Sequence, residues 1–297
     1  MTRTILKWAL PIIALLVVGP LWALVVQGLR APDGGHDVSF LYNASPAMGV
    51  GVGVVAFVIA GVVALITCRL FGPRVGVYVW GLGLLWPAWV TGSVGVMLRA
   101  DPQASTLIML AIEGALIGAG ALVGVGLLSR VGGADHADDD HRRVVPFAKG
   151  FGGQIRRTLT TSAGLAGLGA GVAGAIGAAW LIAQTDMRGQ ALLAALGAGI
   201  VGAVAARLVG SALSQDAPVA TPFIAVALAA VLAPLVGMGY PGAGGLTDAL
   251  VTGSAPGFLF LQPADWGIGI LLGVPIGLSW VGELEHIESH AKSPAVA

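Results

Sequence analysis

Two carboxylic acids stand inside long apolar stretches of this chain. Glu113 lies eight residues into the apolar run 105–128, and Asp265 lies eight residues after the start of the run 257–281. An ionised side chain inside a membrane costs about 2.5–3.5 kcal/mol on insertion scales, so such residues are candidates for function. Buried carboxyl groups can bind protons or cations. Both are therefore candidate transport or proton-binding residues. The alternatives are that Glu113 is a protonated packing residue and that Asp265 caps a helix at the outer surface.

Prolines inside apolar runs give a second hint of a site. Pro87 and Pro234 each remove a backbone hydrogen bond and leave a carbonyl group without its helical partner. Broken helices line the substrate sites of many transporters, so we count both prolines as candidate transport residues. The alternative is a kink that only shapes helix packing. The segment 239–256, rich in glycine, is predicted to form either a surface helix or a re-entrant loop.

The elements that must position these residues are membrane helices. The chain has 297 residues, of which 56% are hydrophobic and 10% charged, and its mean hydropathy is +0.89. Soluble domains carry about 25% charged residues. Runs of roughly twenty apolar residues, enough to cross about 30 Å of hydrocarbon, occur at eight places. They are 5–27, 46–68, 75–98, 105–128, 158–184, 189–206, 219–240 and 257–281.

The distribution of lysine and arginine predicts the orientation. With a cytoplasmic N-terminus, twelve basic residues lie inside and only Arg30, Arg99 and Arg188 lie outside. Cytoplasmic loops carry the excess of positive charge in membrane proteins, so both termini are predicted to be cytoplasmic. This bias is typical of a bacterial inner (cytoplasmic) membrane, which is the predicted location.

Weak internal similarity predicts a duplication. Residues 60–72 and 198–210 share six identities, including Arg69 and Arg207, and further echoes follow in the same order. We therefore expect an all-α integral membrane protein with a 4+4 repeat. Because each half has an even number of spans, the halves would be parallel. The predicted parts are a first membrane half at 1–128, a cytoplasmic linker at 129–157, a second membrane half at 158–282 and a cytoplasmic tail at 283–297.

The residues that could form a histidine-containing metal site occur only in the polar segments. In the tail, Glu283, His286 and His290 would share one face if the last helix continues past the membrane. Two histidines one turn apart can bind zinc, but no further ligand pair is evident, so an exposed charged helix end is the favoured interpretation. The acidic and histidine-containing stretch 135–141 is interpreted as a solvated linker.

Glycine spacing predicts how the helices pack. Gly-x-x-x-Gly patterns occur in 114–124, 167–171 and 269–277. Small residues on one face let membrane helices approach closely. We expect these faces to pack within the chain. Contact with membrane-protein partners or with a second copy is the alternative.

Several function classes are excluded or disfavoured by absences. The net charge is zero and no basic stripe predicts nucleic-acid binding. All five histidines lie outside the apolar runs, so we expect no bis-histidine haem and no zinc within the bundle. The chain contains no Walker A, Gly-x-Ser-x-Gly or His-Glu-x-x-His motif, so we expect no enzyme activity and no cofactor.

Three hypotheses remain open. The preferred one is a secondary transporter or channel for a small solute or ion. The second is a non-catalytic structural subunit of a larger membrane complex. The third, a membrane enzyme that acts on lipid or quinone, would need clustered polar groups at one interface, which the sequence does not display.

Overall fold

The chain folds into a bundle of helices. The computed structural model describes residues 2–132, 150–214 and 217–291, but not the side chains of residues 2–4, 6–7 and 283–291. Within these ranges there is no strand. The elements are α1 (Thr2–Ile13), η1 (Ala14–Val18), α2 (Gly19–Val26), α3 (Pro46–Phe71), α4 (Pro73–Val90), α5 (Val94–Ala100), α6 (Ala104–Gly132), α7 (Phe151–Thr160), α8 (Ser162–Ile182), α9 (Arg188–Leu213), α10 (Thr221–Val236), η2 (Gly237–Gly239), α11 (Gly242–Thr252), η3 (Gly257–Phe260), α12 (Pro263–Ile268), η4 (Gly269–Gly273) and α13 (Val274–Ala291).

Eight helical stretches of the described chain are long and apolar enough to cross a membrane, as predicted. Each overlaps one of the eight apolar runs, so the chain has the character of a polytopic membrane protein. The stretches are Trp8–Val26, Pro46–Phe71, Pro73–Ala100, Ala104–Val131, Ser162–Ile182, Arg188–Leu213, Thr221–Gly239 and Pro263–Gly282.

The eighth stretch begins later than predicted. The sequence run started at Gly257, but residues Gly257–Phe260 form the short turn η3, and the continuous helix begins at Pro263. Gly257 packs so closely against α8 that an added Cβ would lie 1.8 Å from the carbonyl oxygen of Ala183. The segment 239–256 contains the helix α11, which packs against α5.

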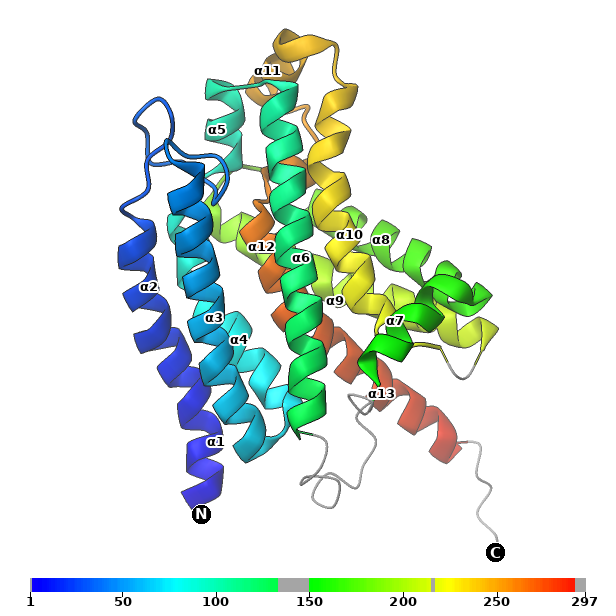
Figure 1. Ribbon diagram of the computed structural model, residues 1–297. Coiled ribbons are helices and arrows are strands. Elements are labelled where there is room, and N and C mark those ends of the chain that lie inside the picture. Colours follow the sequence, from blue (N-terminus) through cyan, green and yellow to red (C-terminus); the bar gives the residue numbers. More distant parts are fainter. Residues whose placement is uncertain (1, 133–149, 215–216, 292–297) are drawn as a thin grey trace, which may run out of the picture.

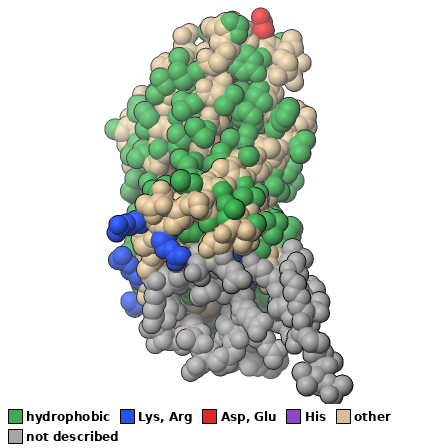
Figure 2. Space-filling view, turned by 90° about the vertical axis from the view of Figure 1, so that its right-hand side faces the viewer, with side chains coloured by type: hydrophobic (Ala, Val, Ile, Leu, Met, Phe, Trp, Pro, Cys, Tyr) green, Lys and Arg blue, Asp and Glu red, His purple; other side chains and the backbone are tan. Residues whose placement is uncertain are grey.

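The two ends of the bundle differ. The start of α1 and the end of α13 lie at one end, whereas α5 and α11 lie at the other (Figure 1). The end that holds α5, α11 and residues 27–45 is called the outer end below, after the predicted orientation. Figure 2 shows one face of the molecule, most of which is hydrophobic. The basic side chains visible on this face gather toward the inner end of the bundle.

The glycine faces pack inside the chain. A Cβ on Gly199 of α9 would lie 2.1 Å from the carbonyl oxygen of Gly269, and one on Gly114 of α6 would lie 2.6 Å from that of Ala230 in α10. The patterns at 167–171 and 269–277 likewise meet neighbouring helices. These glycines bring backbones into contact within the protein, as predicted. Contact with a membrane-protein partner or a second copy stays a prediction.

Two spans contain a wide π turn next to a proline. η1 ends two residues before Pro20, and η4 ends two residues before Pro275. A proline ring collides with the carbonyl group four residues earlier, and a wider turn relieves that collision. Each turn leads directly from one α-helix into the next, so neither span is interrupted.

Candidate functional site

A cavity of about 300 Å³ lies where the two predicted halves meet. Its walls come from α3, α4 and α6 of the first half and from the start of α12 of the second, and residues 40–41 cover its outer side. Glu113 is the ionisable residue in the wall. The other lining residues are Phe40, Leu41, Val50, Gly53, Val54, Ala56, Phe57, Val58, Leu84, Pro87, Ala88, Leu116, Ile117, Gly120, Ala264 and Gly267. This cavity is called the Glu113 pocket below.

Glu113 is buried, with 2% of its surface exposed. It lies nine residues after the start of α6, which corresponds to about 14 Å along the helix axis. Its Oε2 accepts a hydrogen bond of 2.8 Å from the backbone N–H of Leu41. The side chain of Ser39 and the backbone of Phe40 also interact with the carboxyl group. Oε1 has no hydrogen-bond partner.

The loop that reaches Glu113 is held in shape by its own side chains. The amide Nδ2 of Asn43 donates to the carbonyl oxygen of Phe40 (3.0 Å), and Ser39 Oγ accepts from the N–H of Tyr42 (2.9 Å). A Cβ on Gly49 would lie 2.1 Å from Asn43 Nδ2, so the loop can dock against α3 only where that residue has no side chain. The turn therefore directs the Leu41 N–H toward α6.

Tyr42 lies in this loop, outside the membrane-crossing stretches. Burial, and then the negative charges of Asp101 and Asp33, raise the pKa of its phenol above the ordinary value. The hydroxyl group therefore stays protonated and neutral at physiological pH.

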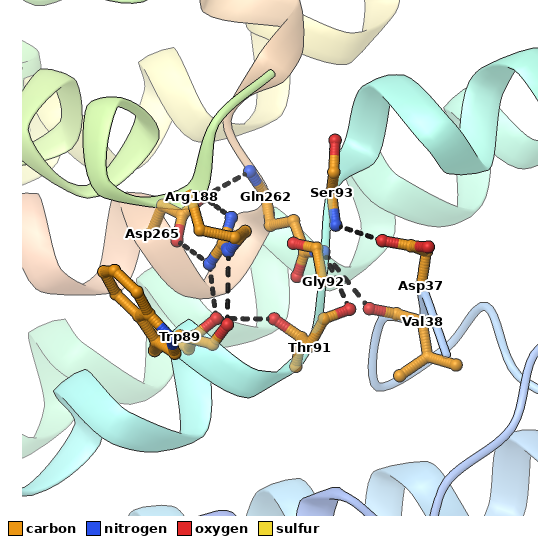
Figure 3. A network of polar contacts seen from close by, with 10 residues as sticks. Asp37, Val38, Trp89, Thr91, Gly92, Ser93, Arg188, Gln262 and Asp265 are labelled. Atoms are coloured by element: carbon orange, nitrogen blue, oxygen red, sulfur yellow. Dashed lines mark hydrogen bonds and ion pairs between the residues drawn. The ribbon is translucent and has the colours of Figure 1, made fainter. Parts of the chain in front are cut away.

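Asp265 has a different structural role from Glu113. Its carboxylate is fully buried and forms a two-pronged ion pair with Arg188: Nη1 to Oδ2 is 2.9 Å and Nη2 to Oδ1 is 2.7 Å (Figure 3). Oδ2 also accepts a hydrogen bond of 2.8 Å from the backbone N–H of Gln262, at the start of α12. The carboxylate thus caps the first turn of its helix, as the alternative raised for it required, but it is fully buried rather than at the surface. It does not line the Glu113 pocket.

The guanidinium group of Arg188 also ties α9 to the end of α4. Nη2 donates to the carbonyl oxygen of Ala88, and Nε donates to that of Trp89 at 3.4 Å (Figure 3). A planar guanidinium can bind a carboxylate through two parallel N–H groups and still donate to carbonyl groups, whereas the ammonium group of lysine cannot form the two-pronged pair.

Gln262 and Asp37 extend this network at the outer end. Gln262 is fully buried, and its Nε2 lies within hydrogen-bond distance of the carbonyl oxygens of Val38 (3.2 Å), Thr91 (3.3 Å) and Gly92 (3.0 Å). Asp37 accepts from the N–H of Ser93 at 2.6 Å. Together with the ion pair, these contacts join the loop over the Glu113 pocket to α4 and α12 (Figure 3).

The four predicted site residues divide into two groups. Glu113 and Pro87 both line the pocket, whereas Asp265 and Pro234 do not. Pro234 is buried within α10, and the carbonyl group that it frees, that of Ala230, packs against Gly114. The two carboxylates do not occupy matching depths either, because Glu113 is well inside α6 and Asp265 is in the first turn of α12.

The metal candidates of the tail are not placed. α13 continues to Ala291, as the shared-face argument required, but the side chains of Glu283, His286 and His290 lie outside the described ones. Elsewhere in the described chain, no group of three or more His, Cys, Asp or Glu residues could hold a metal ion.

Sequence reasoning missed the partners of both acids. Arg188 was counted only as an outer positive charge, and Ser39, Leu41 and Gln262 were not singled out. The signals available were a long outer segment at 27–45 with several polar residues, and a glutamine directly before the last apolar run. Neither signal indicates which helix the residue contacts.

No family model, curated protein or solved structure matches the chain. The functional argument therefore depends on the geometry described above.

Proposed function

We propose that the protein is a secondary transporter or channel for a small solute or ion, in which Glu113 binds the proton or the transported cation. The observation that carries the proposal is a buried carboxyl group on a membrane helix, with one oxygen unpartnered, in the wall of a cavity of about 300 Å³. Its described partners, Ser39, Phe40 and Leu41, are neutral. Such intramembrane acids typically mark ion pathways.

The loop over the Glu113 pocket links the carboxyl group of Glu113 to access from the outer side of the pocket. Leu41 donates to Glu113 and also lines the pocket, so the same hydrogen bond holds the outer cover in place. Protonation of Glu113, or binding of a cation, changes the strength with which the carboxyl group accepts that bond. The pocket and the outer side are thereby coupled through one contact.

The predicted 4+4 repeat is part of the proposal, and the packing pattern supports it. In the first half α4 contacts α2, α3 and α6, and α3 contacts α6; in the second half α10 contacts α8, α9 and α12, and α9 contacts α12. Between the halves, α6 packs on α10 and α4 packs on α12. If the two halves are related by a twofold axis along the membrane normal, as in parallel-repeat transporters, that axis exchanges these two contacts.

Two further expectations belong to the proposal. A bacterial inner membrane with both termini cytoplasmic remains the predicted setting, on the basis of the positive charges. An enzymatic role remains disfavoured. Among the polar side chains described at the outer end, Arg188, Asp265 and Gln262 make contacts that are suited to holding helices together.

The test is proton-coupled flux in liposomes that contain the purified protein and an internal pH dye. Panels of small cations, amines, amino acids and sugars are added in turn. We expect at least one class to change the internal pH, and we expect Glu113→Gln to lower that rate at least tenfold. Asp248→Asn, which removes an exposed acid on α11, is the matched control and should leave the rate unchanged. Equal rates in wild type and Glu113→Gln, or no response to any class, would overturn the proposal.

A further inference from the structure

The Glu113 pocket opens sideways, toward the lipid-facing surface of the bundle. Val54 of α3 and Leu116 of α6 both line it and are 55% and 57% exposed. Deeper in the bundle α3 and α6 close together, where Phe57 packs on Gly120; a Cβ on that glycine would lie 3.2 Å from the Phe57 ring. The mouth therefore lies between two membrane helices, beside Val54 and Leu116.

The outer side of the pocket is closed. Phe40 and Leu41 lie over it, and their loop is fastened by Asn43, by the Glu113 carboxyl group and by the Gln262 contact to Val38. A molecule that approaches from the bilayer meets an apolar opening, whereas one that approaches from the outer aqueous phase meets this fastened cover.

The chemistry of the pocket selects its occupant. Apart from Glu113 the lining side chains are aliphatic or aromatic, so they favour a hydrocarbon chain. The carboxyl group has one unpartnered oxygen, and its described partners are neutral donors. A cationic donor at the end of a hydrocarbon chain supplies both the missing hydrogen bond and the missing countercharge. A fatty acid would instead bring a second negative charge beside the first.

We propose that the Glu113 pocket binds a lipophilic amine that enters from the bilayer, with its ammonium group on Glu113 Oε1 and its alkyl chain between α3 and α6. The inference rests on the proposed function, because it names the class of molecule that a transporter with this pocket would carry. Binding itself does not require transport.

The test measures binding of decylamine to the purified protein in nanodiscs by the shift of the unfolding temperature, with decanol and decanoic acid as equal-length probes. We expect decylamine to bind at least tenfold more tightly than either of the others. Glu113→Gln should weaken decylamine binding at least tenfold and leave decanol binding unchanged. Equal affinity for decylamine and decanol, or an unchanged affinity in Glu113→Gln, would overturn the inference, because the amine would then bind by partition into lipid alone.

Two neighbouring substitutions distinguish binding in the pocket from binding to the surrounding lipid. Val54→Trp places a large ring in the mouth and should abolish decylamine binding. Val55→Trp is the matched control, since Val55 is also exposed on α3 but does not line the pocket. If both variants bind like the wild type, the pocket is not the site.

The outcomes for binding and for flux are independent. Amine binding that depends on Glu113 and Val54, without any proton-coupled flux, would support the site and overturn the transporter proposal. Flux of another solute that depends on Glu113, with no amine binding, would overturn the lipophilic-amine inference and leave the transporter proposal standing.

Discussion

At the scale of single residues, the two acids illustrate how the same chemical group takes opposite roles. Asp265 is paired with a guanidinium group and caps a helix, so its charge is compensated and its geometry fixed. Glu113 lines a cavity, contacts neutral donors and has one oxygen without a hydrogen-bond partner. A compensated ion pair stabilises an arrangement, whereas a carboxyl group with a vacant acceptor can exchange a ligand.

This difference predicts a large effect on stability for Asp265. Asp265→Asn leaves the largely buried Arg188 guanidinium without its countercharge and should lower the free energy of unfolding by about 3–5 kcal/mol. Unfolding in a mixed-detergent titration measures the change. The double variant Arg188→Met, Asp265→Leu removes both charges and should recover a substantial part of the loss. If Asp265→Asn is as stable as the wild type, the ion pair does not hold α9 to α12.

At the scale of helices, close contact between α9 and the η4–α13 region depends on glycine. Gly199 meets the backbone of Gly269, and Gly273 meets that of Leu196, at distances that leave no room for a methyl group. Lipid-facing helices gain little from the hydrophobic effect when they associate, so direct backbone packing provides much of the attraction. The glycine faces therefore hold the last span in the position where its first turn, α12, forms one wall of the Glu113 pocket.

A matched pair of glycine substitutions tests this packing. Gly199→Ala would place its Cβ 2.1 Å from the Gly269 carbonyl oxygen and should lower the unfolding temperature strongly, with a loss of about 1–3 kcal/mol or more. Gly177→Ala in α8 makes the same chemical change where nothing lies within 4 Å, and it should alter stability by less than about 1 kcal/mol. Thermal unfolding of the two variants side by side gives the comparison. Similar stability of both would show that α9 and the last span are not in close contact.

At the scale of the whole molecule, interactions at both ends hold the two predicted halves together. At the outer end Arg99 pairs with Asp186 at 2.6 Å, and the network around Arg188 lies beside this pair. At the inner end the Arg74 guanidinium donates to Ser279 Oγ at 2.5 Å. A pocket between the halves is thus enclosed by contacts above and below it, and its mouth lies to the side.

The orientation of the whole bundle gives a prediction that does not depend on any transport model. Cys68 is the single cysteine and is fully buried, so the wild type should not react with a membrane-impermeant maleimide. Thr160→Cys, two residues before the start of α8, and Asp248→Cys on α11 place exposed thiols on sides of the membrane that the predicted orientation makes opposite. In intact cells we expect labelling of Asp248→Cys alone, and in inverted membrane vesicles labelling of Thr160→Cys alone. The reverse pattern would mean that the positive-inside interpretation is wrong.

The sequence by itself determined the membrane character of the chain, the number of spans and the positions of most of them. These properties depend on the local balance of apolar and charged residues over about twenty positions, which requires no knowledge of neighbours. The sequence also identified Glu113 and Asp265, because a lone acid in an apolar run is conspicuous wherever it packs.

Only the tertiary structure decided what those acids do. Their partners, Leu41 for Glu113 and Arg188 for Asp265, are 72 and 77 residues away along the chain. Periodicity within a span cannot say which distant backbone or side chain will face it, since that is set by how the glycine faces bring the helices together. The same contacts separate Asp265 from the pocket and leave Glu113 within it.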